Sequence, residues 1–137
     1  MVTQKSPGGS IFPYYYKGGE LFGLHYGSFF ADEGALLARM NAEEEFIAKA
    51  NRPLPLWIDF YETKLTDRVL IEFSKSILRL QRQIPKLALV GCSFKDRRRF
   101  HKLAKKSGIE FPMPVRFFSD PEEAKTWLVR EGGQALI

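Results

Sequence analysis

One stretch gathers the side chains of this sequence that could do chemistry. Residues 90–108 read VGCSFKDRRRFHKLAKKSG and place the only cysteine, Cys92, a few residues before the densest run of positive charge and His101. A thiolate is a nucleophile, and a helix N-terminus lowers the pKa of a thiol. Three hypotheses follow: a reactive thiol, a nucleic-acid contact, or an amphipathic helix with a solvated basic side.

Helical spacing favours the third hypothesis. At about 100° per residue, Phe100 and Leu103 fall on one side of a helix, and Arg98, Lys102 and Lys105 gather on the opposite side. No aromatic platform or known nucleic-acid-binding module accompanies the charge. We therefore predict a basic surface at Arg98, Lys102 and Lys105 and expect no nucleic-acid partner.

A second group of polar residues surrounds Asp59. This acid stands near the end of the apolar segment LWIDF at 56–60, and open α/β sheets bind ligands beyond the carboxyl ends of their strands. The group could hold a small polar ligand or receive a phosphoryl group. The favoured alternative is structural: Asp59 accepts backbone N–H bonds within its own loop, and Thr66 caps a helix. The hypothetical binding residues are Asp59, Thr63, Lys64, Thr66, Asp67 and Arg68.

Other catalytic and cofactor signals do not occur in the sequence. Two histidines and one cysteine have no compact metal-ligand spacing. The Gly18-Gly19 pair suits a hairpin turn, and neither a Walker motif nor a dinucleotide fingerprint follows a predicted strand. We predict no metal, no cofactor and no catalytic residue.

Composition indicates one globular domain. The chain has 137 residues, of which 45% are hydrophobic, and we expect a single domain over 1–137 with residues 1–10 flexible. Of the 21 Lys and Arg residues seven lie in 95–106, against one of the 16 acids, so the excess positive charge is local. A lone cysteine, no apolar leader in residues 1–10 and no membrane span predict a cytoplasmic protein.

The predicted elements alternate after an initial hairpin. Strands at 11–16 and 21–30 flank the Gly18-Gly19 turn. Ser93 and Asp96 have the spacing of a capping box, and Asp120-Pro121 is a strong helix start. This order predicts an α/β fold with an open, mostly parallel sheet, an N-terminal antiparallel hairpin and helices packed on it. The later strands are predicted at 56–60, 87–90 and 115–118, and the helices at 32–50 and after Thr66, Ser93 and Asp120.

Three segments resemble the STAS-like domains related to bacterial anti-sigma-factor antagonists, in particular the SpoIIAA-like branch. They are PLWIDFYETKLTD at 55–67, KLALVGC at 86–92 and VRFFSDPEEAKTWL at 115–128. The resemblance implies a STAS fold and a non-enzymatic role in protein–protein binding. In that family a serine at the helix start is phosphorylated; here Arg68 stands at the most similar place, with Thr66 nearby, so the resemblance does not imply the switch.

Three functional hypotheses remain at this point. The first is a regulatory or interaction domain that binds another protein or itself through the region Asp59–Phe73. The second, which the family's relation to lipid-binding SEC14 domains also implies, is a small apolar-ligand or lipid binder with a pocket beneath the amphipathic helices. A hydrolase or thiol enzyme comes last. Aromatic residues of the hairpin would line the pocket: Phe12, Tyr14, Tyr15, Tyr16 and Phe22.

Overall fold

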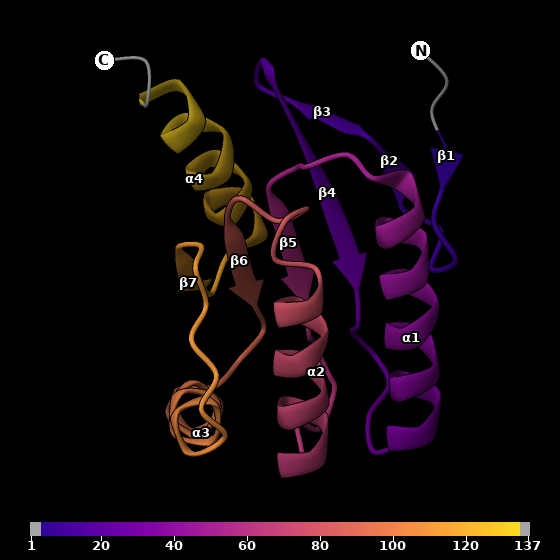
Figure 1. The fold of residues 1–137 in the computed structure, drawn as a ribbon, viewed down its shortest axis with the longest axis vertical. Coiled ribbons are helices and arrows are strands. Elements are labelled where there is room, and N and C mark those ends of the chain that lie inside the picture. The colour runs from indigo at the N-terminus through magenta and orange to yellow at the C-terminus, as the bar shows by residue number, and fades with distance from the viewer. Residues whose placement is uncertain (1–3, 135–137) are drawn as a thin grey trace.

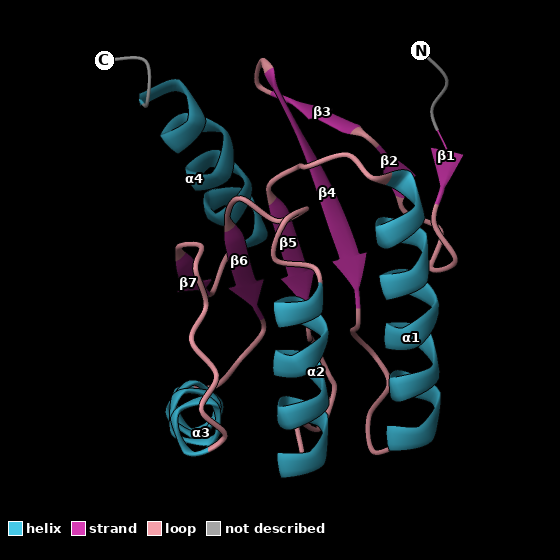
Figure 2. Cartoon of the chain, viewed as in Figure 1, coloured by secondary structure: helices cyan, strands magenta, loops and turns pink. Residues whose placement is uncertain are grey.

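The computed structural model describes residues 4–134, and the side chains of residues 4–130. Five strands form one sheet in the order β3-β4-β5-β6-β7, in which β3 and β4 are antiparallel and the other neighbours are parallel (Figures 1 and 2). The α/β prediction is confirmed. The strands are β1 (Gln4–Lys5), β2 (Ile11–Phe12), β3 (Tyr14–Tyr16), β4 (Gly19–His25), β5 (Leu56–Asp59), β6 (Leu87–Val90) and β7 (Val115–Phe118); the helices are α1 (Glu33–Ala50), α2 (Asp67–Arg79), α3 (Phe94–Lys106) and α4 (Pro121–Gln134).

Three helices cover one face of the sheet. Alternate residues of the strands, such as Phe22, Ile58 and Leu89, point to this face and pack against α1, α2 and α3. The ring of Phe73 on α2 lies 5.2 Å from that of Phe60 and 6.1 Å from that of Phe100 on α3. This face holds the larger of the two hydrophobic clusters.

Helix α4 alone packs on the opposite face. Its buried residues Ala124 and Leu128 meet Leu21, Trp57 and Val90, which point away from the three-helix face. The indole of Trp57 lies across Gly23 of the neighbouring strand, where a Cβ atom would stand 2.6 Å from Nε1. Gly23 is therefore needed to let the indole lie flat on the sheet.

The hairpin turn lies one residue earlier than predicted. Tyr16 pairs with Gly19, so the two-residue turn is Lys17-Gly18, and both of these residues have positive φ angles (45° and 85°). Gly19 is a strand residue instead: a Cβ atom there would stand 2.8 Å from the Val129 side chain of α4. The second glycine of the pair thus serves helix packing and not the turn.

The second hairpin strand is shorter than the predicted 21–30. It ends at His25, and the backbone of Ser28 and Phe30 is left-handed, with φ of 61° and 51°. His25 is exposed on the face opposite the buried Phe22 and Leu24. Residues after His25 form a loop because they contact the loop that follows β5.

A short strand pair precedes the main sheet. Residues 4 and 5 form β1, which pairs with β2, within a segment that the sequence predicted to be flexible; residues 1–3 lie outside the described residues. The hydroxyl of Ser6 is buried and donates to Glu43 of α1 at 3.0 Å. A hydrogen bond from the Gly8 backbone also reaches Glu43, so this carboxyl fastens the N-terminal segment to α1.

The predicted helix starts are confirmed. Thr66 Oγ1 accepts the Val69 N–H at 3.1 Å, and Ser93 with Asp96 forms the full capping box of α3. Asp120 Oδ1 accepts the Glu122 N–H at 3.1 Å. Because these caps stand directly before α2, α3 and α4, they fix where each helix begins after its strand.

Candidate functional site

Loops leave the carboxyl ends of β4, β5 and β6 at one edge of the sheet. The first two are bonded to each other through their backbones: Ser28 N–H donates to the Tyr61 carbonyl at 2.5 Å, Phe30 N–H to that of Glu62 at 2.8 Å, and Lys64 N–H to that of Phe30 at 2.7 Å. These bonds satisfy backbone groups that lie outside the sheet. The two loops therefore form one ordered unit.

The third loop packs closely on the same unit. A Cβ atom at Gly91 would lie 2.7 Å from the Tyr61 nitrogen, and one at Gly27 would lie 2.9 Å from the Tyr61 carbonyl oxygen. Gly91 also has a φ of +84°, which L side chains rarely adopt. The backbone of Tyr61 is thus held between its two neighbouring loops, with the left-handed residues Ser28 and Phe30 beside it.

Each of these loop regions carries one exposed aromatic side chain. Phe30 is 61% exposed, Tyr61 is 59% exposed, and Phe94, the first residue of α3, is 72% exposed. We call Phe30, Tyr61 and Phe94 the carboxyl-edge aromatic patch. Removing such side chains from water is favourable, and the ordered loops already hold their backbones in place. Exposed aromatics on a pre-formed surface are typical of interaction sites.

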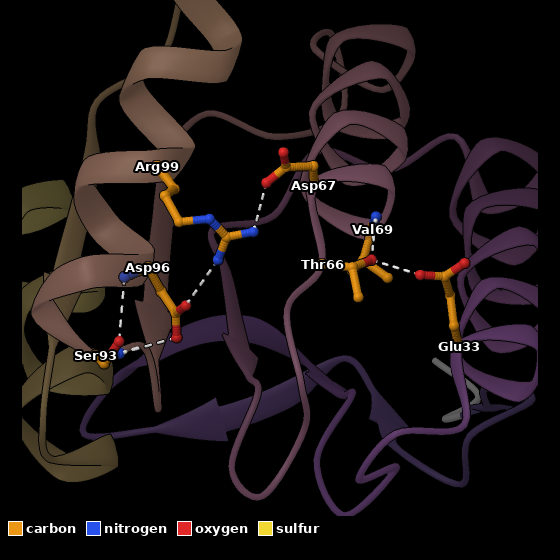
Figure 3. Close-up of polar contacts among 7 residues, drawn as sticks. All are labelled: Glu33, Thr66, Asp67, Val69, Ser93, Asp96 and Arg99. Carbon is orange, nitrogen blue, oxygen red and sulfur yellow. Dashed lines mark hydrogen bonds and ion pairs between the residues drawn. The ribbon is translucent and has the colours of Figure 1, made fainter.

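A chain of polar contacts ties the first turn of α3 to the first turn of α2 (Figure 3). Asp96 accepts from Arg99 at 3.2 Å, and the same guanidinium donates to Asp67 at 2.6 Å. Ser93 completes the chain through the capping box with Asp96. The acids at this point are therefore used to hold the first turns of two helices together.

A similar contact ties α2 to α1. The hydroxyl of Thr66 donates to Glu33 at 2.5 Å (Figure 3). Arg68 reaches the other oxygen of the same carboxylate at 3.4 Å. Thr66 therefore donates and accepts at once, since it also caps α2 through Val69. Sequence spacing predicted the cap but not the link to Glu33, which is 33 residues away.

The six hypothetical binding residues do lie at one edge, but their side chains do not converge on one point. Asp59 accepts the Tyr61 N–H at 2.9 Å, as the structural alternative predicted. The hydroxyl of Thr63 donates to the Tyr26 carbonyl at 2.8 Å and accepts the Phe29 N–H at 3.1 Å. These polar side chains, and those of Thr66, Asp67 and Arg68 described above, therefore bond to other groups of the chain. Lys64 is exposed.

Cys92 is half-buried against the main hydrophobic cluster. Burial raises the pKa of its thiol to about 12, and the charges of Asp96 and Asp59 act in the same direction while Arg97 opposes them. A thiol with this pKa is protonated at neutral pH, so Cys92 has none of the activation that a nucleophilic cysteine needs. The effect of burial on the thiol pKa thus outweighs the lowering expected from its position after a strand and before a helix.

The basic surface lies where helical spacing placed it. Arg98, Lys102 and Lys105 are exposed on α3, opposite the buried Phe100 and Ala104. The guanidinium of Arg98 lies 5.9 Å from the ring centre of Phe94, so the surface begins beside the aromatic patch.

The hairpin aromatics divide between the two faces of the sheet. Phe12 and Phe22 pack edge to face at 4.8 Å on the three-helix side, where the space left beside them is about 10 Å³, room for about one water molecule. The pocket expected beneath the amphipathic helices is therefore filled at this place. Tyr14 and Tyr16 stack on the opposite face, and Tyr15 is exposed.

Two charged residues that the sequence patterns did not single out lie away from full solvent exposure: Glu43 is buried and Lys125 is half-buried. Glu43 is fully buried, and burial raises the pKa of its carboxyl although Ser6 donates to it. Its spacing from Met40 and Ile47 on α1 was a signal that could have placed it on the buried side. Lys125 of α4 lies 5.1 to 5.7 Å from the ring centres of Tyr14, Tyr16 and Trp57.

Searches against family models, curated proteins and solved structures matched nothing. Among residues 4–134, no group of three or more His, Cys, Asp or Glu side chains could hold a metal ion. Within the same residues, no helix is long and apolar enough to cross a membrane. The site is therefore interpreted from its own geometry.

Proposed function

We propose that this chain is a non-enzymatic interaction domain, resembling the STAS-like anti-sigma-factor antagonists, that binds another protein or a second copy of itself through the carboxyl edge of its sheet. The observation that carries the proposal is the carboxyl-edge aromatic patch, in which three neighbouring loop regions each expose one large ring. Aromatic anchors contribute most of the binding energy in many protein interfaces. Tyr61 of the patch lies within the region Asp59–Phe73 that the first hypothesis names.

The rigidity of the loops supports a binding role. The backbone bonds between Phe30, Glu62 and Lys64 and the close approach of Gly91 to Tyr61 fix the loops before any partner arrives. A surface that is already ordered loses less conformational entropy on binding. The internal use of Asp59, Thr63 and Thr66 in holding these loops fits the same role.

The proposed partner binding does not use the family's phosphoserine switch. Arg68 stands at the place most like that serine, and the nearby Thr66 hydroxyl is committed to Glu33 and to the N-cap of α2. A phosphate on Thr66 would face the Glu33 carboxylate and lose the cap. The proposed binding therefore involves no phosphorylation of Thr66.

The test compares the patch with an exposed aromatic elsewhere. The double variant Tyr61→Ser/Phe94→Ser is used as bait in affinity capture from source-cell lysate, beside the wild type and the control Tyr15→Ser, whose ring is 63% exposed on β3. Sedimentation of each protein measures self-association. We expect the double variant to lose the captured protein or the dimer, and Tyr15→Ser to keep it. Equal binding by all three folded proteins contradicts the proposal.

A further inference from the structure

A second site lies on the other face of the sheet, where α4 stops covering it. Gly23 and His25 of β4 and Trp57 of β5 form part of its lining, together with Tyr14 of β3 and Lys125 of α4. Residues 9–11 complete the lining. The pocket has a volume of about 390 Å³, within the usual range for small-molecule sites.

Aromatic rings account for much of the lining. The His25 ring meets Trp57 edge-on at 5.6 Å, and Tyr14 is 38% exposed beside them. Because Gly23 has no side chain, the floor next to the indole stays flat. A flat floor between rings suits a planar apolar group, which can stack or pack edge to face there.

The charge of the lining is one-sided. Its eight residues include the cation Lys125 and no carboxylate. The acid that pairs with Lys125 is Glu122, at 3.0 Å, and Glu122 is exposed at the solvent side, where it also accepts from the Tyr16 hydroxyl at 2.7 Å. The Lys125 side chain itself is 12% exposed, and its ammonium group has three donors, so an anion inside the pocket can bind it beside Glu122.

From these observations we infer that the pocket of Tyr14, Gly23, His25, Trp57 and Lys125 binds a small planar aromatic carboxylate. The ring system packs on the flat floor beside Trp57, and the carboxylate faces Lys125. The site is on the opposite face from the pocket that the sequence predicted, and it does not depend on the carboxyl-edge aromatic patch.

The test uses two probes that differ only in charge, 2-naphthoate and 2-naphthamide. Binding is followed by NMR through the indole N–H signals of Trp57 and Trp127, assigned with Trp127→Phe. We expect naphthoate to shift the Trp57 signal and to bind about tenfold more tightly than the amide, the difference expected for one charge-assisted contact. Equal affinities, no binding, or a shift confined to Trp127 would overturn the inference.

Variants of the lysines locate the charge effect. Lys125→Met should remove the preference for naphthoate while keeping weak binding of the amide, and Lys125→Arg should restore it. Lys17→Met is the matched control, since Lys17 also lies over the Tyr16 ring, at 5.3 Å, but is outside the lining. Thermal unfolding confirms that each variant is folded. A preference that survives in folded Lys125→Met contradicts the assignment of Lys125.

Discussion

The two faces of the sheet are covered to different extents. On the three-helix face, the space beside Phe12 and Phe22 is about 10 Å³, whereas the single helix α4 leaves about 390 Å³ beside Trp57 on the other face. Both faces are lined by aromatic residues of the same hairpin. The difference accompanies the number of covering helices: the face that α4 covers leaves an aromatic side chain such as Tyr14 partly exposed, whereas Phe12 and Phe22 on the three-helix face are buried.

The same contrast predicts unequal costs for core truncation. Phe73→Ala removes a ring that packs between Phe60 and Phe100, and we expect a loss of about 3–5 kcal/mol in the free energy of unfolding. Leu128→Ala on the α4 face should cost less, about 2 kcal/mol, because the smaller cluster can relax toward the part of the sheet that α4 leaves uncovered. Urea denaturation measures both. Equal losses would mean that α4 packs as tightly as the three-helix layer.

Glu43 offers a pH-dependent test of the three-helix face. Burial raises the pKa of its carboxyl, so the folded state holds this proton more tightly than the unfolded state does. The stability that Glu43 contributes is therefore complete below its unfolded pKa and is lost as the pH rises through the raised, folded pKa. Glu43→Gln should remove this fall, and at neutral pH it should be at least as stable as the wild type.

The control for this measurement is Glu45→Gln. Glu45 lies on the same helix but is exposed, in a pair with Lys49 at 3.0 Å. Its removal should change stability by less than about 1 kcal/mol and leave the pH dependence in place. Denaturation curves collected from acid to neutral pH compare the three proteins. An unchanged pH profile in Glu43→Gln would show that another group causes it.

Local sequence patterns predicted most of the fold because their causes are local. Ser93 and Asp96 cap α3 with atoms three residues apart, and Thr66 caps α2 through the N–H of Val69, also three residues away. The hairpin turn was misplaced by one residue for a non-local reason. Gly19 is required by Val129, more than 100 residues later, and nothing in the turn sequence reports that contact.

The candidate site was predicted only in part for the same reason. The sequence pointed to the loop after β5, and both the loop hydrogen bond of Asp59 and the helix cap of Thr66 followed from neighbouring residues. The aromatic patch instead needs Phe30 and Phe94 to arrive from two other loops, which depends on strand order. In the sequence Phe30 directly follows Phe29 and Phe94 stands among polar residues, and neither ring is distinguishable from a core residue.

The smallest expected effect concerns the solvent-exposed side of α3, one of the helices on the three-helix face. Arg98, Lys102 and Lys105 are exposed, and the buried side of the helix is formed by Phe100 and Ala104. Replacing the three cations by Glu should therefore change the free energy of unfolding by about 0.5 kcal/mol or less per site.

The charge reversal also sharpens the comparison between surface and site. Because Arg98 lies over the Phe94 ring, partner capture by the triple variant reports whether the basic surface extends the carboxyl-edge aromatic patch. Lost capture with unchanged stability would extend the patch along α3 toward an acidic partner. Retained capture would confine binding to the loops, and a large loss of stability would show that the helix is held by its charges as well as by Phe100.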